Sequence, residues 1–193
     1  MRKSVQFLLL FLMCISASWT WASDAPERTV LFNMGDYDSQ YWRIPALVTA
    51  ADNSLVAVVD KRGSSLGDLP NTISIMSRRS TDNGKNWSEP VVVAQGGNGK
   101  TYGDPAVVLD KKTGNLICMF VGDQGLWNAT PDNRQGIYVS KSTDNGVSWS
   151  EPVAITDQVY ANHSGWYAGF AGSGHGLCLK DGRLMFVLAI RAT

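Results

Sequence analysis

Several residue types and patterns are scarce in this chain of 193 residues, and each scarcity excludes a class of protein. Only 18% of the residues are charged, and 17 basic side chains balance 17 acidic ones, so no basic surface is available to bind a nucleic acid. The three cysteines and two histidines match no metal or redox motif. No apolar run approaches the ~18 to 20 residues that cross a bilayer. The remaining class is a globular protein, 44% hydrophobic, whose length favours one domain.

The N-terminal segment has the pattern of an export signal. A basic start and an apolar run over residues 5–15 precede a small residue, Ala22. This pattern predicts a signal peptide over residues 1–22 and a mature domain over residues 23–193 that is secreted or periplasmic. The alternative is a lipoprotein anchored at Cys14, but the methionine before it is bulkier than such sites favour.

The two cysteines of the mature domain, Cys118 and Cys178, both lie in apolar runs. Export permits a disulfide, but a small buried hydrophobic residue is the ordinary role of cysteine in such a context. We therefore expect both thiols to be free and buried.

A twelve-residue segment occurs twice in the mature chain. Residues 80–91 (STDNGKNWSEPV) return 62 residues later as residues 142–153 (STDNGVSWSEPV), with ten of the twelve positions identical. In such a turn the aspartate accepts backbone N–H groups, the glycine takes a positive φ, and the tryptophan packs against the sheet. A calcium loop would need oxygen ligands at alternating positions, whereas each turn offers one acidic residue. We interpret the repeat as structural.

Pairs of apolar segments alternate with this repeat, and each pair flanks a polar turn that contains asparagine or glycine. The expected strand pairs are residues 45–48 with 54–59, 105–109 with 116–121, and 176–179 with 184–190. Third strands are expected at 72–77 and 136–140, and fourth strands at 91–94 and 153–156. Four antiparallel strands every sixty or so residues are typical of a β-propeller blade. We therefore predict an all-β propeller of about two and a half blades, without helices.

The first strand pair carries residues that the others lack. Arg43-Ile44-Pro45 opens it, Arg62 follows 19 residues after Arg43, and Asp68 lies 25 residues after Arg43 on a glycine-rich loop. With the repeated turns, which match the Asp-box (BNR) repeat, this order and spacing resemble the secreted bacterial sialidases (neuraminidases), whose fold is a six-bladed propeller. The resemblance covers nearly all of residues 23–193, roughly the first half of a catalytic domain.

The resemblance implies a role for individual residues. Arg43 is similar to the first of three arginines that bind the carboxylate of sialic acid, for which a planar guanidinium is well suited. Asp68 resembles the acid/base carboxylate that protonates the leaving oxygen and then activates water. Arg62 resembles the arginine that contacts a sugar hydroxyl, with Asp104 as its partner; the alternative for each is to cap a turn of its blade. Trp127 is expected either at the apolar wall around the N-acetyl methyl group or in the core.

The resemblance also implies the activity, a retaining exo-α-sialidase that acts on sialylated glycans and needs no metal or organic cofactor. The tyrosine nucleophile, its activating glutamate and two further arginines have no counterparts in this sequence, because Tyr160, Tyr167 and Glu151 occur too early. Two alternatives therefore remain open, a truncated inactive fragment and a non-catalytic propeller module that binds glycans or proteins. His163 and His175 have no partners at useful spacing, and we interpret them as structural.

Overall fold

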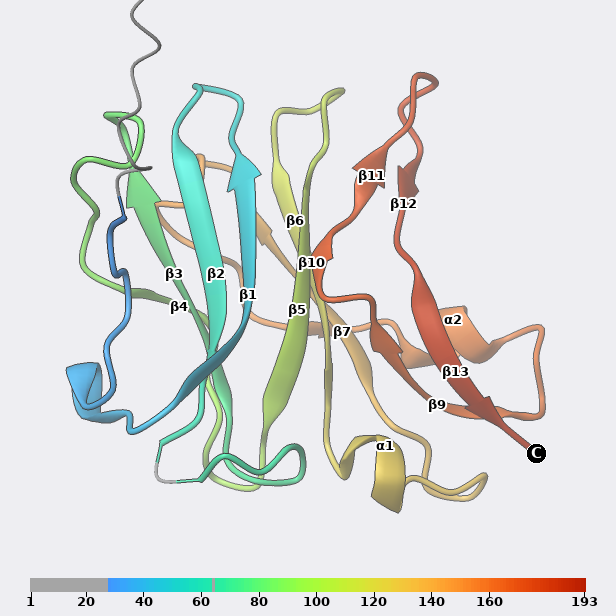
Figure 1. Ribbon diagram of the computed structural model, residues 1–193. Helices are drawn as coiled ribbons and strands as arrows, with labels where there is room; N and C mark the ends of the chain where they lie inside the picture. The colour runs from blue at the N-terminus through green and yellow to red at the C-terminus, as the bar shows by residue number, and fades with distance from the viewer. Residues whose placement is uncertain (1–27, 64) are drawn as a thin grey trace, which may run out of the picture.

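The computed structural model describes residues 28–63 and 65–193, which form three successive groups of strands (Figure 1). The first is an antiparallel sheet of β1 (Trp42–Thr49), β2 (Leu55–Lys61), β3 (Ser74–Ser80) and β4 (Val91–Ala94), paired in that order. The second repeats this order with β5 (Tyr102–Leu109), β6 (Leu116–Gly122), β7 (Ile137–Ser142) and β8 (Val153–Ala154). The two four-stranded units predicted from the repeat are thus confirmed. The predicted signal peptide, residues 1–22, lies outside the described residues.

The third group differs from its prediction. β9 (Trp166–Ala171) pairs with β13 (Leu188–Ala192), and β11 (Leu177–Cys178) pairs with β12 (Leu184–Met185). Between them, β10 (Gly174–His175) pairs in parallel with β5. The first strand of this group therefore begins at Trp166 rather than at residue 176, and glycines interrupt it. The parallel pair arises because the first strands of neighbouring groups run in the same direction.

The described chain contains three short helices, one before β1 and two in connections between strands, contrary to the expectation of none. They are the 3-10 helix η1 (Asp36–Asp38), α1 (Gly125–Asn128) and α2 (Thr156–Tyr160). At most five residues long, they leave no periodic pattern in the sequence. The fourth strand expected over residues 153–156 is correspondingly shorter, because Thr156 starts α2 and its hydroxyl accepts a 3.0 Å hydrogen bond from the Ile137 N–H. Within residues 28–63 and 65–193, no helix is long and apolar enough to cross a membrane.

The repeated turns use their polar side chains within the turn itself. Ser80 Oγ donates to Asp82 Oδ1 (2.8 Å) and accepts the Gly84 N–H (2.8 Å), while Asp82 Oδ1 also accepts the Asn86 N–H (2.9 Å). The second turn, residues 142–149, has the corresponding bonds: its serine hydroxyl donates to the aspartate and accepts the glycine N–H, and the aspartate accepts a second backbone N–H. The carboxylate oxygens are therefore bonded to turn donors, as the structural interpretation expects.

The second turn also joins the first two sheets. Trp149 Nε1 donates to Ser77 Oγ on β3 (3.0 Å), whereas Trp87 Nε1 bonds the Gly84 carbonyl of its own turn (2.9 Å). Trp149 packs against a core shared by both sheets. Fully buried members of this core from both sheets are Val56, Val58, Ile75, Leu116 and Phe120. The two sheets are thus held together by one apolar core.

Both cysteines of the described chain are free, as expected. Cys118 is fully buried on β6, in agreement with its apolar neighbours. Cys178 is only half-buried, so the expectation of burial is wrong for this thiol. Its strand, β11, belongs to a two-stranded hairpin that covers less of its own surface than a four-stranded sheet does.

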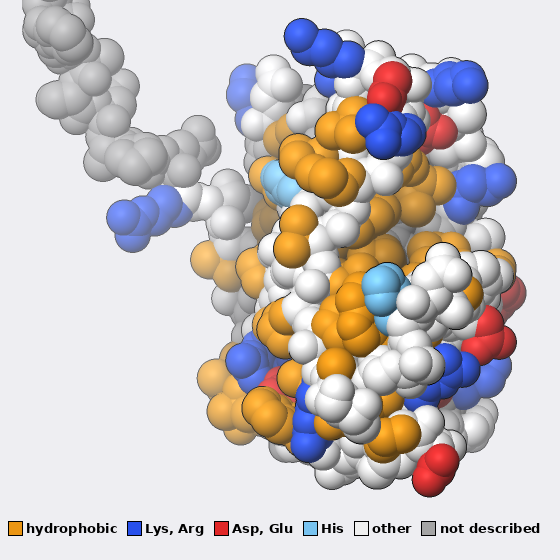
Figure 2. Space-filling model, turned by 90° about the vertical axis from the view of Figure 1, so that its right-hand side faces the viewer, with side chains coloured by type: hydrophobic (Ala, Val, Ile, Leu, Met, Phe, Trp, Pro, Cys, Tyr) orange, Lys and Arg blue, Asp and Glu red, His pale blue; other side chains and the backbone are white. Residues whose placement is uncertain are grey.

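The third group leaves apolar side chains uncovered. Figure 2 views the molecule from the side on which Figure 1 places β12 and β13, and hydrophobic side chains gather on this face. The exposed large hydrophobic residues of the third group are Leu177, Met185 and Val187. In the first two sheets the second strand pairs with a third, but β12 and β13 have no such neighbour in the described part of the chain. This face is therefore an unpaired sheet edge with apolar side chains beside it.

Candidate active site

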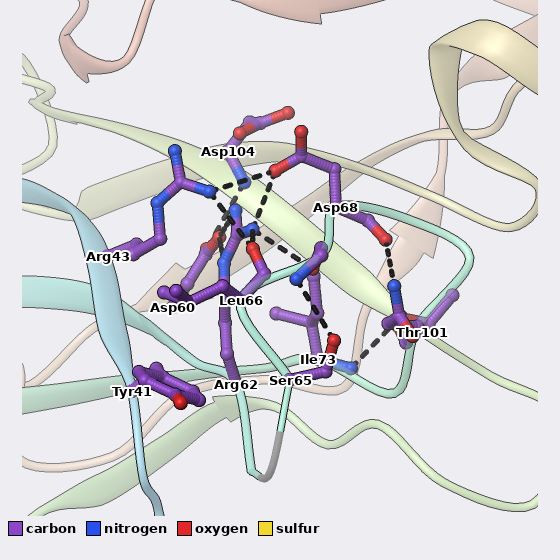
Figure 3. Close-up of polar contacts among 12 residues, drawn as sticks. Tyr41, Arg43, Asp60, Arg62, Ser65, Leu66, Asp68, Ile73, Thr101 and Asp104 are labelled. Atoms are coloured by element: carbon purple, nitrogen blue, oxygen red, sulfur yellow. Dashed lines mark hydrogen bonds and ion pairs between the residues drawn. The ribbon is translucent and has the colours of Figure 1, made fainter. Parts of the chain in front are cut away.

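A pocket of about 290 Å³ lies at the end of the sheets where α1 is found, the lower end in Figure 1. All five residues to which the sequence assigned a role line it. Arg43 comes from β1, Arg62 from the residue after β2, Asp68 from the β2–β3 loop, Asp104 from β5 and Trp127 from α1. The fold thus brings to one pocket five residues that are widely separated in the sequence, four of which Figure 3 labels.

Arg43 and Asp104 occupy equivalent irregularities in the first strands of their sheets. The pairing of β1 with β2 and of β5 with β6 shifts register at this point. Ile44 has φ 56° and Asp104 has φ 58°, and a proline follows each, Pro45 and Pro105. Proline suits a bulge because it has no N–H to offer the ladder. A positive φ at the β-branched Ile44 is strained, which marks this strand end as a constrained part of the site.

Arg62 is held by bonds at three of its nitrogens. Nε and Nη2 donate to Asp60 Oδ2 at 3.2 and 2.8 Å, and the two side chains are 1% and 0% exposed. Nη1 donates to Asp68 Oδ1 at 2.6 Å and to the carbonyls of Leu66 and Gly67 at 3.1 Å each (Figure 3). Burial lowers the pKa of Arg62, but the hydrogen bonds and charges of Asp68 and Asp60 outweigh it and raise the pKa. Arg62 is therefore a fixed cation at the pocket wall.

Asp60 is a site residue that the sequence analysis missed. Besides Arg62, its carboxylate accepts the backbone N–H of Asp104 at 3.2 Å, so it connects β2 to the bulge of β5. A side chain at Gly103 would place its Cβ 3.3 Å from Asp60 Oδ2, and glycine leaves room for the carboxylate. Burial and the charge of Asp104 raise the pKa of Asp60 to about 7, although Arg62 acts in the opposite direction. The available signal was an aspartate ending an apolar strand two residues before an arginine.

Asp68 and Arg43 lie at the more open side of the pocket. Arg43 Nη1 donates to Asp68 Oδ1 at 3.3 Å and to the Leu66 carbonyl at 3.1 Å, and the side chains of Arg43 and Asp68 are 42% and 63% exposed. One oxygen of Asp68 is thus shared by two guanidiniums, those of Arg43 and Arg62. A carboxylate that binds Arg43 from the pocket competes with Asp68 for this cation.

Asp104 and Arg62 share the pocket, but their side chains form no hydrogen bond with each other in the described part of the chain; Asp60 connects them through the Asp104 backbone N–H. Burial raises the pKa of Asp104, opposed by the charge of Arg62 and, more weakly, that of Arg43, while Asp68 reinforces the rise. Asp104 therefore presents a partly desolvated acceptor to the pocket.

Trp127 is 73% exposed, so the alternative that placed it in the core is wrong. Its loop is held by Arg191 of β13, whose Nη1 donates to the carbonyls of Leu126 and Trp127 at 3.1 Å each. The same guanidinium lies 5.9 Å from the Trp127 ring centroid and 5.4 Å from that of Tyr167. These distances are typical of cation–π contacts. Arg191, which the sequence analysis did not single out, thus connects the third group of strands to the pocket.

The pocket wall also has an apolar part. Leu69, Ile73, Leu126 and Phe170 line it, and Leu69, Ile73 and Phe170 belong to one apolar cluster. Gln135 lines the pocket as well and is 1% exposed. The site can therefore accept a ligand that has an anionic group at one end and a small apolar group at another.

Comparison with known proteins identifies the family. The family described as BNR repeat-like domain matches residues 44–192. The chain belongs to this family. A sialidase from Bacteroides fragilis (strain YCH46) is 34% identical over 171 residues, which cover 79% of this chain and 31% of that protein. A sialidase from Micromonospora viridifaciens is 35% identical over 152 residues, which cover 73% of this chain and 23% of that protein. The predicted sialidase family is thus confirmed.

Comparison with solved structures shows that the chain shares the fold of known sialidases. The Hadza microbial sialidase Hz136 superposes with a TM-score of 0.73 at 31% identity, covering 82% of this chain and 34% of that one. The intramolecular trans-sialidase from Ruminococcus gnavus superposes with a TM-score of 0.74 at 15% identity, covering 84% and 58%. The sialidase-type β-propeller fold is therefore confirmed. The chain spans less than half the length of the curated relatives that it matches here.

Proposed function

We propose that this chain carries part of the active site of an exported, retaining exo-α-sialidase, which hydrolyses terminal sialic acid from glycoproteins, glycolipids and oligosaccharides. The observation that carries the proposal is the shared position of Asp68 between Arg43 and Arg62 at the mouth of the pocket. These are the carboxylate-binding, hydroxyl-binding and acid/base residues that the family resemblance implies. The sialidase relatives at 34% and 35% identity support the same activity.

The charges suggest how a sialoside would bind. Arg43 is half exposed and bonds Asp68 through a single nitrogen, Nη1, so a substrate carboxylate can take this guanidinium in bidentate fashion. Asp68 then keeps Arg62 as its cationic partner and lies on a loop at the pocket mouth, where the glycosidic oxygen would be. In its protonated form it can donate to that oxygen, and as a carboxylate it can accept a proton from water.

The tyrosine nucleophile of a retaining sialidase and the glutamate that activates it are not assigned to any residue of this chain. No tyrosine lines the pocket in the described part of the chain, and Tyr160 and Tyr167 are 1% and 8% exposed. The complete reaction therefore needs further groups than these residues supply. The lack of a tyrosine in the pocket lining of the described residues favours a second candidate function, a propeller module that binds sialosides without turning them over.

Release of a fluorophore from a fluorogenic α-sialoside by the full chain tests the proposal. We expect Asp68→Asn to lower the rate at least about a hundredfold, because general acid–base catalysis contributes roughly that much or more. Asp181→Asn is the matched control, since Asp181 is an exposed aspartate paired with Arg183 and lies outside the pocket. If the wild type releases the fluorophore above the enzyme-free blank, an equal rate for Asp68→Asn would contradict the role of Asp68. Sialoside binding without fluorophore release by the wild type would favour the second candidate.

A further inference from the structure

Gln135 is fixed in the pocket wall by the strand beside it. Its backbone N–H donates to the Tyr167 carbonyl at 2.8 Å, and its side-chain Oε1 accepts the Gly169 N–H at 3.1 Å. Both partners belong to β9. Because a backbone N–H can only donate, the atom that faces Gly169 is the amide oxygen, and the amide nitrogen Nε2 points the other way.

The Nε2 group has no acceptor among the described residues. In the same part of the chain, the buried side-chain polar atom that lacks a partner and is sealed from solvent is Tyr160 Oη. Gln135 Nε2 therefore keeps contact with solvent, although the residue as a whole is 1% exposed. Since Gln135 lines the pocket, this contact is through the pocket. An unpaired donor in such a place gains free energy when a ligand supplies an oxygen.

The surroundings of Gln135 restrict the kind of ligand oxygen that can accept a hydrogen bond from its Nε2. Gly169, whose N–H the Gln135 side chain accepts, is followed on β9 by Phe170. Phe170 packs with Leu69 and Ile73 in one apolar cluster and lines the pocket with them. The charged residues of the pocket come from β1, the β2–β3 loop and the bulge of β5. Gln135 thus adds one neutral donor to the apolar part of the wall. A group with one acceptor oxygen and an apolar end fits such a wall, whereas a chain of several hydroxyls would lose hydrogen bonds there.

We propose that Gln135 donates a hydrogen bond from Nε2 to the carbonyl oxygen of the N-acyl substituent of a bound sialic acid, and that it thereby selects N-acylated sugars. This inference rests on the proposed function. A sugar with a hydroxyl in place of the N-acyl group would leave the apolar wall uncovered and the donor of Gln135 without its partner.

Binding measurements test this inference without requiring turnover. The probes are the methyl α-glycosides of N-acetylneuraminic acid and of its analogue with a hydroxyl at the acyl-bearing carbon, titrated against the full chain by saturation-transfer NMR. The variant Gln135→Glu keeps the shape and the acceptor for Gly169 but loses the donor. We expect it to weaken binding of the N-acetyl sugar relative to the hydroxyl sugar by about three- to tenfold, as for one hydrogen bond. Both sugars carry the same carboxylate, so repulsion by the new charge cancels in this ratio.

Gln158→Glu on α2 introduces the same charge at an exposed position outside the pocket, and it should leave the ratio unchanged. If Gln135→Glu does not fold, Gln135→Leu, which removes the donor without adding charge, supplies the ratio instead. An unchanged ratio in the folded variant overturns the inference and leaves the proposed function intact, provided that the wild type binds a sialoside. If the wild type binds neither sugar, the proposed function fails first.

Discussion

Asp60 and Arg62 form an ion pair sealed from solvent, with Asp60 Oδ2 2.8 Å from Arg62 Nη2 and the two side chains 0% and 1% exposed. They are two residues apart at the end of β2, and so lie on the same face of the chain. Removing two charges from water is costly, and the cost is offset here by bonds from Arg62 and from the Asp104 N–H. The pair therefore fixes a cation at the pocket wall and anchors the neighbouring sheet.

Replacing Arg62 by methionine should destabilise the protein strongly. Arg62→Met leaves the ionised Asp60 carboxylate buried without its main partner, and losing one member of a buried pair costs about 3 to 5 kcal/mol of unfolding free energy. Urea denaturation at about pH 8 measures the change. Arg183→Met is the control, because the Arg183–Asp181 pair is exposed and screened by solvent, so its loss should leave the stability nearly unchanged. Equal stabilities for the two variants would show that the buried pair is not a structural anchor.

The raised pKa of Asp60 predicts a pH dependence of stability. The folded protein holds this proton up to a pKa of about 7, whereas the unfolded chain releases it near 3.8. The stabilisation from this proton is fully present below pH 3.8 and is lost as the pH rises toward about 7. Asp60→Asn cannot titrate, so the wild type should lose stability relative to Asp60→Asn between about pH 4 and about pH 8. Urea denaturation of both proteins across this range checks the sign, and an opposite trend would contradict it.

The repeated parts of the fold could be predicted from the sequence, because each repeat carries its own local signals. The copies at residues 80–91 and 142–153 fix the turn between the third and fourth strands, and polar turns fix the strand pairs. The third group was predicted less well, since its first strand is interrupted at Gly172 and Gly176. Its parallel pairing with β5 depends on the arrangement of whole sheets, which no local pattern encodes.

The pocket residues likewise fall into those that a local sequence pattern predicts and those that depend on contacts between distant segments. Arg43, Arg62 and Asp68 were found because they stand in a fixed order along one stretch of chain. Gln135 and Arg191 act through contacts with strands and loops remote in the sequence, so spacing gave no signal for them. Asp60 was missed because an aspartate at a strand end is usually a solvated residue, and its burial follows only from the packing of β5 against β2.

Arg191 should control the order of the Trp127 loop. Arg191→Met removes two hydrogen bonds to carbonyls of α1 and the cation–π contact with Trp127. We expect faster amide hydrogen exchange over residues 125–129 and a loss of about 1 to 3 kcal/mol of stability, as for hydrogen bonds to a charged group. Arg79→Met, which removes a pair with Asp52 at the β1–β2 turn, should leave exchange over residues 125–129 unchanged. Unchanged exchange in Arg191→Met would rule out this positioning role.

The two repeated turns allow a matched comparison of their glycines. Gly84 and Gly146 have nearly equal φ values, 88° and 86°, so alanine at either should cost about 1 kcal/mol of stability through backbone strain. A Cβ on Gly146 would lie 2.8 Å from Val56 Cγ2 of the first sheet, whereas on Gly84 the nearest atom, of Leu55, is 3.8 Å away. Overpacking adds about 1 to 3 kcal/mol, so Gly146→Ala should be the more destabilising variant in urea denaturation.

The same comparison can separate strain from overpacking. Val56→Ala removes the methyl groups that a Cβ on Gly146 would meet, so part of the cost of Gly146→Ala should disappear in the Val56→Ala background. The cost of Gly84→Ala should be the same in both backgrounds, because its Cβ does not reach Val56. Equal costs for Gly146→Ala with and without Val56→Ala would mean that the second turn does not hold the two sheets in close contact at this point.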